Sequence, residues 1–133
     1  MGCQTNEHVQ KTVLICEDEP IVAMDLEMMV GDMGYRVIGP CASRSEARLM
    51  IIKERPDAAI LDVQLRDGEV FPLAKRLHEC GTRLVFQSGH SRAEEIEDRF
   101  PGAIFCEKPV WGHQLEEALR RFLDSEPKND ATN

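Results

Sequence analysis

Short runs of apolar residues alternate along the chain with longer segments whose apolar residues recur every three or four positions. The runs lie at residues 11–16, 35–39, 57–62, 83–88 and 103–106. Runs of this length, bounded by turn residues, are typical of strands that are buried on both faces of a sheet. We therefore predict five strands, each followed by a helix.

The longer segments have the periodicity of helices. In residues 20–34, Pro20 suits the first turn of a helix and Gly34 suits its end. Ser43 and Ser45 are both candidates to cap the next helix. The remaining helical segments are residues 43–54, 69–80, 91–100 and 113–123. Five consecutive strand–helix units predict an α/β fold, in which a parallel sheet is covered by helices on both faces.

The length of 133 residues favours a single domain. We expect this domain to span residues 11–124. Residues 1–10 and 125–133 contain little that could be buried, and we expect both segments to be flexible.

Composition excludes several classes of function. The net charge is −8, and no run of Lys and Arg stands out, which disfavours binding to nucleic acid. The start of the chain lacks a secretory signal, and no apolar run could cross a bilayer. The five cysteines form no C-x-x-C pair, as expected of reduced thiols. We expect a cytoplasmic protein without a membrane partner.

Polar side chains follow four of the predicted strands. Glu17 and Asp18 come after the first strand, Asp62 ends the third, Ser88 ends the fourth, and Lys108 follows the fifth. Ligands of open α/β sheets bind outside the carboxyl ends of the strands. We therefore expect these side chains to converge on one edge of the sheet.

This set of side chains permits a narrow range of chemistry. Glu17, Asp18 and Asp62 would repel one another unless a cation lay among them. Oxygen ligands without histidine or thiolate favour Mg²⁺ over zinc. One carboxylate could then attack a phosphoryl group, with Lys108 and Ser88 stabilising the transferring oxygens. Each residue alone has a plainer explanation, such as helix capping or surface solvation, so the prediction rests on their combination.

Four motifs, "VLICEDEP", "AAILDVQLRDG", "LVFQSG" and "FCEKP", resemble those of bacterial response-regulator receiver domains of the stand-alone type. The resemblance covers residues 11–124. It implies a doubly wound, flavodoxin-like fold with five parallel strands in the order 2-1-3-4-5. It also implies that Asp62 accepts a phosphoryl group from a histidine kinase or a histidine phosphotransfer protein of a two-component phosphorelay.

The resemblance also assigns roles around Asp62. Asp18 would bind Mg²⁺ directly and Glu17 through water, with Asp62 itself and the backbone carbonyl of Gln64 as further ligands. Ser88 and Lys108 would hold the phosphoryl oxygens.

The resemblance also assigns residues that would change conformation on phosphorylation and residues that would set the lifetime of the phosphoryl group. Ser88 and Phe105 would reorient after phosphorylation, and Gln64 and His90 would tune how long the phosphoryl group lasts. The resemblance also implies a cis bond between Lys108 and Pro109.

The chain departs from the related pattern Phe-Ala-Thr-Gly-Tyr. Gln87, Ser88 and His90 replace Ala, Thr and Tyr, although Ser88 keeps the hydroxyl group. Val110 replaces an aromatic residue. These departures bear on phosphoryl lifetime and choice of partner more than on phosphorylation itself.

The sequence thus predicts a response regulator, a signalling protein that catalyses only its own phosphorylation and dephosphorylation. We expect no effector domain after residue 124. We therefore expect output through contact with a downstream protein, by way of the surface around the fourth helix, fifth strand and fifth helix. Two alternatives remain: a phosphate sink for a kinase, and a degenerate receiver that binds partners without phosphorylation.

Two other classes fit less well. A flavodoxin-type nucleotide binder would need a loop rich in Gly, Ser and Thr after the first strand, where this chain has "CEDEP". An aspartate-nucleophile phosphohydrolase typically has Asp-x-Asp there, whereas Asp18 and Pro20 occupy that spacing here.

Overall fold

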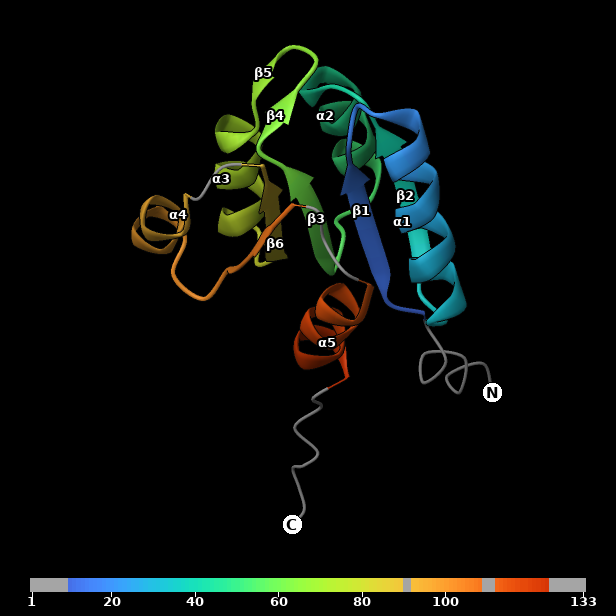
Figure 1. Ribbon diagram of the computed structural model, residues 1–133. Coiled ribbons are helices and arrows are strands. Elements are labelled where there is room, and N and C mark those ends of the chain that lie inside the picture. The colour runs from blue at the N-terminus through green and yellow to red at the C-terminus, as the bar shows by residue number, and fades with distance from the viewer. Residues whose placement is uncertain (1–9, 90–91, 109–111, 125–133) are drawn as a thin grey trace, which may run out of the picture.

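A parallel sheet of five strands forms the middle layer of the computed structural model, which describes residues 10–89, 92–108 and 112–124 (Figure 1). Its order is β2-β1-β3-β6-β7. The strands are β1 (Thr12–Cys16), β2 (Arg36–Cys41), β3 (Ala58–Asp62), β6 (Arg83–Ser88) and β7 (Ile104–Glu107). Because β4 and β5 form a separate hairpin, this order is the predicted 2-1-3-4-5. The doubly wound α/β fold is therefore confirmed.

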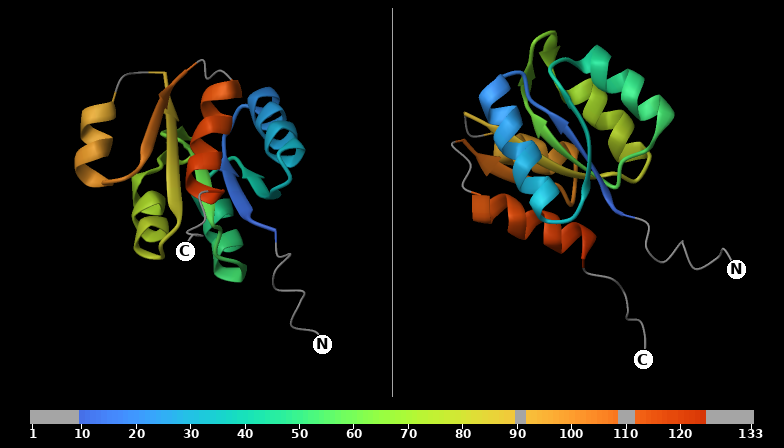
Figure 2. Two further views of the ribbon diagram at one scale, coloured as in Figure 1. Left: turned by 90° about the horizontal axis from the view of Figure 1, so that it is seen from below. Right: turned by 90° about the vertical axis from the view of Figure 1, so that its right-hand side faces the viewer.

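Helices cover both faces of the sheet. They are α1 (Pro20–Asp32), α2 (Arg44–Lys53), α3 (Phe71–Glu79), α4 (Ala93–Arg99) and α5 (Gly112–Leu123). Figure 2 shows α1 and α5 on one face, with α2 and α3 on the other. The buried side chains form two corresponding clusters, one under α1 and α5 and one under α2, α3 and α4.

Alternation along the strands explains why the apolar runs are continuous. In β1, Leu14 packs into the cluster under α2, α3 and α4, whereas Val13 and Ile15 pack into the cluster under α1 and α5. In β3, Leu61 packs into the cluster under α2, α3 and α4, and Ile60 packs into the cluster under α1 and α5. Side chains on both faces are buried, so no polar residue interrupts these strands until their carboxyl ends.

The helix starts follow the sequence signals. Pro20 lies in the first turn of α1, and α3 also begins with a proline in its first turn. Ser43 is the N-cap of α2, and its side chain accepts a hydrogen bond from the backbone N–H of Glu46 at 3.2 Å. Of the two capping candidates, Ser43 is the one confirmed.

Strand β2 is longer than predicted, because it continues from Gly39 to Cys41 through a cis Gly39–Pro40 bond. The register between β1 and β2 shifts at this point. Gly39 has a φ of 95°, and a Cβ atom there would lie only 2.9 Å from the backbone nitrogen of Cys41. At the end of β2, the carbonyl of Cys41 accepts a hydrogen bond from the N–H of Glu17 at 2.9 Å.

A short antiparallel hairpin, β4 (Gln64–Leu65) and β5 (Gly68–Glu69), follows directly after Asp62 and was not predicted. Asp67 at its turn accepts a hydrogen bond from the backbone N–H of Arg44 at 2.8 Å. The guanidinium of Arg44 donates in return to the carbonyl of Asp67 at 2.5 Å. The start of α2 thus holds the hairpin in place.

No helix in the described part of the chain combines the length and the apolar character that crossing a bilayer requires.

Replacing Ile60 by alanine should test the assignment of the core. Ile60 is fully buried in the cluster under α1 and α5, so we expect the free energy of unfolding to fall by about 2–5 kcal/mol. The matched control is Ile52→Ala, because Ile52 in α2 is 69% exposed and its loss should change stability by no more than about 0.5 kcal/mol. Urea denaturation of both variants measures the difference, and equal losses would contradict the assigned burial.

Candidate functional site

The polar residues singled out in the sequence lie at the carboxyl ends of the central strands. Glu17 and Asp18 follow β1, Asp62 is the last residue of β3, Ser88 is the last residue of β6, and Lys108 follows β7. One carboxylate oxygen from each of Glu17, Asp18 and Asp62 lies within 4.8 Å of the others. The parallel topology thus brings together three acidic side chains from the carboxyl ends of two strands, β1 and β3.

Asp62 is only 6% exposed, and its carboxylate has two hydrogen-bond donors among the described residues. Lys108 Nζ lies 2.8 Å from Oδ2, and the backbone N–H of Gln64 donates to Oδ1 at 3.1 Å. A buried carboxylate without such partners would cost several kcal/mol. The ammonium group of Lys108 explains why an apolar strand can end in an acid.

Glu17 is more deeply buried, with 2% of its surface exposed. Its Oε1 accepts a hydrogen bond from Gln87 Nε2 at 2.9 Å and lies 3.2 Å from Lys108 Nζ, while Oε2 accepts from the N–H of Glu19 at 3.1 Å. Burial raises the pKa of Glu17 from 4.5 to about 7; the charge of Asp62 adds to the rise, and Glu19 and Lys108 oppose it.

For Lys108, burial and the neighbouring carboxylates shift the pKa in opposite directions. Burial alone would lower the pKa of its ammonium group, but hydrogen bonding to Asp62 and the charges of Asp62 and Glu17 outweigh that effect and raise it. Lys108 therefore remains protonated at neutral pH.

The other predicted site residues surround this cluster. Ser88 is buried, and its carbonyl accepts a hydrogen bond from the backbone N–H of Lys108 at 2.7 Å. Phe105 in β7 is half-buried against the cluster under α2, α3 and α4, and Gln64 is exposed at the start of the hairpin. His90 and the Lys108–Pro109 bond lie outside the described residues, as do residues 1–9, 110 and 125–133.

Gln87 is the residue that the sequence analysis missed. The sequence singled it out only as a replacement for alanine, yet the structure places its amide against Glu17. The available signal was a polar side chain inside the otherwise apolar run "LVFQS". Buried amides need hydrogen-bond partners, so its position already indicated a specific contact.

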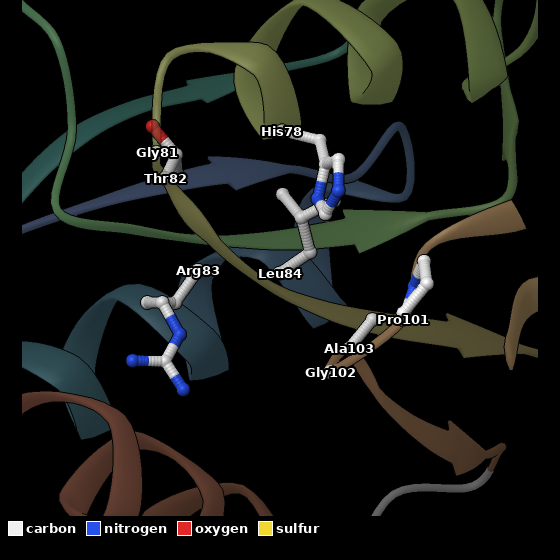
Figure 3. A pocket seen from close by; sticks show the side chains of 8 residues that line it. All are labelled: His78, Gly81, Thr82, Arg83, Leu84, Pro101, Gly102 and Ala103. Carbon is white, nitrogen blue, oxygen red and sulfur yellow. The ribbon is translucent and has the colours of Figure 1, made fainter.

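A pocket of about 240 Å³ lies at the opposite ends of β6 and β7, away from the carboxylates (Figure 3). It is lined by His78, Thr82, Arg83 and residues 101–103, among others. Arg83 is directed away from His78, and its guanidinium lies 4.3 Å from the ring centroid of Phe122 in α5. This basic group is therefore used in packing, and none of the described residues that line the pocket is acidic.

The carboxylate cluster fits a hard divalent cation. Three carboxylates face a single ammonium group, so their negative charge is only partly balanced within the cluster. The donor atoms are all oxygen, which suits Mg²⁺. Burial is the largest cause of the raised pKa of Glu17, and the negative charge of Asp62 contributes to it.

The family model for the response regulator receiver domain matches residues 13–120. Among solved structures, a response regulator receiver protein from Sinorhizobium medicae aligns with a TM-score of 0.78 at 26% identity, covering 87% of this chain and 96% of that chain. The REC domain of the PhyR response regulator from Erythrobacter litoralis aligns with a TM-score of 0.77 at 26% identity, covering 96% and 98%.

Two curated relatives show the same likeness over part of their length. The phyllosphere-induced regulator PhyR of Methylorubrum extorquens is 46% identical over 57 residues, which cover 42% of this chain and 21% of that protein. The transcriptional regulatory protein DpiA of Escherichia coli is 31% identical over 117 residues, covering 84% and 51%. This chain thus spans about a fifth to a half of the length of these relatives.

The raised pKa of Glu17 predicts a pH dependence of stability in the absence of divalent ions. Between pH 4.5 and about 7, the folded protein holds a proton that the unfolded chain has lost. The contribution of Glu17 is therefore fully present below pH 4.5 and is lost as the pH rises through about 7, with a slope of at most about 1.4 kcal/mol per pH unit.

Chemical denaturation of wild type and Glu17→Gln in EDTA, from pH 5 to pH 8, isolates this contribution. The difference between their free energies of unfolding should shift against the wild type as the pH rises to about 7 and then level off. An unchanged difference across this range would show that Glu17 titrates normally.

Proposed function

This chain belongs to the response regulator receiver domain family, and from that premise we propose that it accepts a phosphoryl group on Asp62 in a Mg²⁺-dependent reaction. The donor would be a histidine kinase or a histidine phosphotransfer protein of a two-component system. The observation on which the proposal rests is the placement of Asp62 beside Lys108, at 2.8 Å, within a cluster of three carboxylates.

Asp62 is the best candidate for the nucleophile among the three acids. It ends β3, which lies between β1 and β6 at the centre of the sheet, so groups from both neighbouring strands flank it. The side chain of Glu17 is fully buried, so a donor could not reach its carboxylate directly. The side chain of Asp62 retains 9% exposure at the open edge, where a donor can approach.

Asp18, Asp62 and the backbone carbonyl of Gln64 would hold Mg²⁺, with Glu17 acting through water. The ion would supply positive charge to the phosphoryl oxygens during transfer. Its presence would also relieve the repulsion among the carboxylates, which Lys108 alone balances only in part.

In the proposed transfer, an oxygen of Asp62 attacks the phosphorus of a phosphohistidine. An O–P bond forms while the P–N bond breaks, and the imidazole leaves with the bonding electron pair and takes up a proton. Lys108 Nζ, which donates to Asp62 Oδ2 at 2.8 Å, would neutralise a phosphoryl oxygen. The hydroxyl of Ser88 would donate a hydrogen bond to another phosphoryl oxygen.

Output would follow from reorientation of Ser88 and Phe105 and a change in the surface of α4, β7 and α5. Helix α4 spans only Ala93–Arg99, and within it only Ile96 is buried. So little buried apolar surface implies low local stability, which a movable surface requires.

The phosphodonor must reach Asp62 across the edge of the sheet that α1 borders. Helix α1 begins directly after the acidic loop and exposes Ile21, Met24 and Met28 at helical spacing. We propose that this apolar stripe belongs to the surface that the donor contacts. The free thiols of Cys16, Cys41, Cys80 and Cys106 suit a reducing compartment, and we place the exchange in the cytoplasm.

Incubation with Mg²⁺ and acetyl phosphate should add one phosphoryl group to the protein, as measured by intact mass spectrometry. Asp62→Asn should abolish the addition, and so should removal of divalent ions with EDTA. Asp98→Asn on the exposed side of α4 is the matched control and should be labelled like the wild type.

The labelling experiment separates phosphorylation on Asp62 from two other outcomes. No uptake by the folded wild type would favour a degenerate receiver that binds partners without phosphorylation. Uptake that persists in Asp62→Asn would place the acceptor elsewhere. A phosphate sink would be labelled like a regulator, and a separate comparison of partner binding before and after labelling distinguishes the two, because a sink would show no change.

A further inference from the structure

Gln87 contacts the acidic cluster from within the apolar sheet. It precedes Ser88 in β6, is 1% exposed, and pairs in register with Asp62 of β3. Its side chain extends to the loop after β1, where Nε2 donates to Oε1 of Glu17 at 2.9 Å. Gln87 therefore links β6 to an acid that follows a strand two places away in the sheet.

We propose that Gln87 is a positioning residue for the metal site, which fixes the carboxylate of Glu17 and thereby sets the affinity for Mg²⁺. This inference rests on the proposed function, because it assumes that Glu17, Asp18 and Asp62 bind a divalent ion.

The burial of Gln87 indicates that its contact is specific. Its neighbours Val85 and Phe86 are fully buried and apolar, as expected for this strand. An amide at such a depth costs free energy unless it is hydrogen-bonded, whereas an apolar side chain would not. The bond to Glu17 offsets this cost.

The three donors to Glu17 differ in what they can do. The N–H of Glu19 belongs to the same loop and moves with it. Lys108 is shared, lying 2.8 Å from Asp62 and 3.2 Å from Glu17, and in the proposed reaction it serves the phosphoryl group. Gln87 anchors Glu17 to the sheet and remains available throughout.

The side chain of Gln87 is uncharged, which matters for binding of a cation beside Glu17. A cationic side chain in this position would hold Glu17 but would repel the metal. An amide orients the carboxylate without adding positive charge beside the ion. Hydrogen-bond partners of metal-binding groups typically change metal affinity by about 10–100-fold when they are replaced.

The test is the Mg²⁺ dissociation constant of the full chain by isothermal titration calorimetry, for wild type, Gln87→Met and Gln87→Asn. Methionine keeps the length and volume without the hydrogen bond; asparagine keeps the amide on a side chain one methylene shorter. We expect both to weaken Mg²⁺ binding by about tenfold. The rate of labelling by acetyl phosphate at saturating Mg²⁺ should change little, while its half-saturation shifts to higher Mg²⁺.

A double-mutant cycle separates positioning from a general structural effect. If Gln87 acts through Glu17, Gln87→Met should have no further effect on Mg²⁺ affinity in a Glu17→Ala background. An equal loss in both backgrounds would overturn the inference. Wild-type affinity in Gln87→Met and Gln87→Asn would also overturn it and leave the proposed function intact, whereas failure of the wild type to bind Mg²⁺ would refute the proposed function itself.

Discussion

The ion pair of Lys108 with Asp62 and Glu17 is the interaction on which the site depends. Parallel strands that are buried on both faces carry polar side chains at their carboxyl ends, which all lie at one edge of the sheet. The acids at the ends of β1 and β3 therefore meet at an edge that is poorly solvated. One ammonium group at 2.8 Å and 3.2 Å makes this arrangement possible without balancing it fully. A divalent ion would neutralise the remaining negative charge. Burial is the main reason that the pKa of Glu17 rises to about 7, and the charge of Asp62 adds to the rise.

The segment after Asp62 connects this edge to helices on both sides of the hairpin. Arg44 at the start of α2 bonds to Asp67, and Arg92 before α4 forms an ion pair with Glu69 at 2.8 Å. Arg92 also lies 5.1 Å from the ring centroid of Phe71, the first residue of α3. The hairpin that begins two residues after the proposed acceptor is thus bonded to the same helix that we expect to move.

Much of the fold and the site was predictable because strands that are buried on both faces appear in the sequence as continuous apolar runs. The apolar runs located the strands, and the residues that end them located Glu17, Asp18, Asp62, Ser88 and Lys108 at one edge. The hairpin was missed because strands of two residues have no periodicity to detect. The extension of β2 through Gly39 depends on the register with β1, and the contact of Gln87 with Glu17 depends on side-chain direction across β3, which separates β6 from β1. Spacing along the sequence does not encode either one.

Diffraction from crystals grown with Mn²⁺, a hard ion that also prefers oxygen ligands, tests most directly whether the carboxylates form a metal site. An anomalous difference map should show one strong peak bonded to Asp18 and Asp62, with Glu17 facing the ion through a water molecule. A map without a peak at this edge, in crystals where the loops after β1 and β3 point apart, would contradict the account.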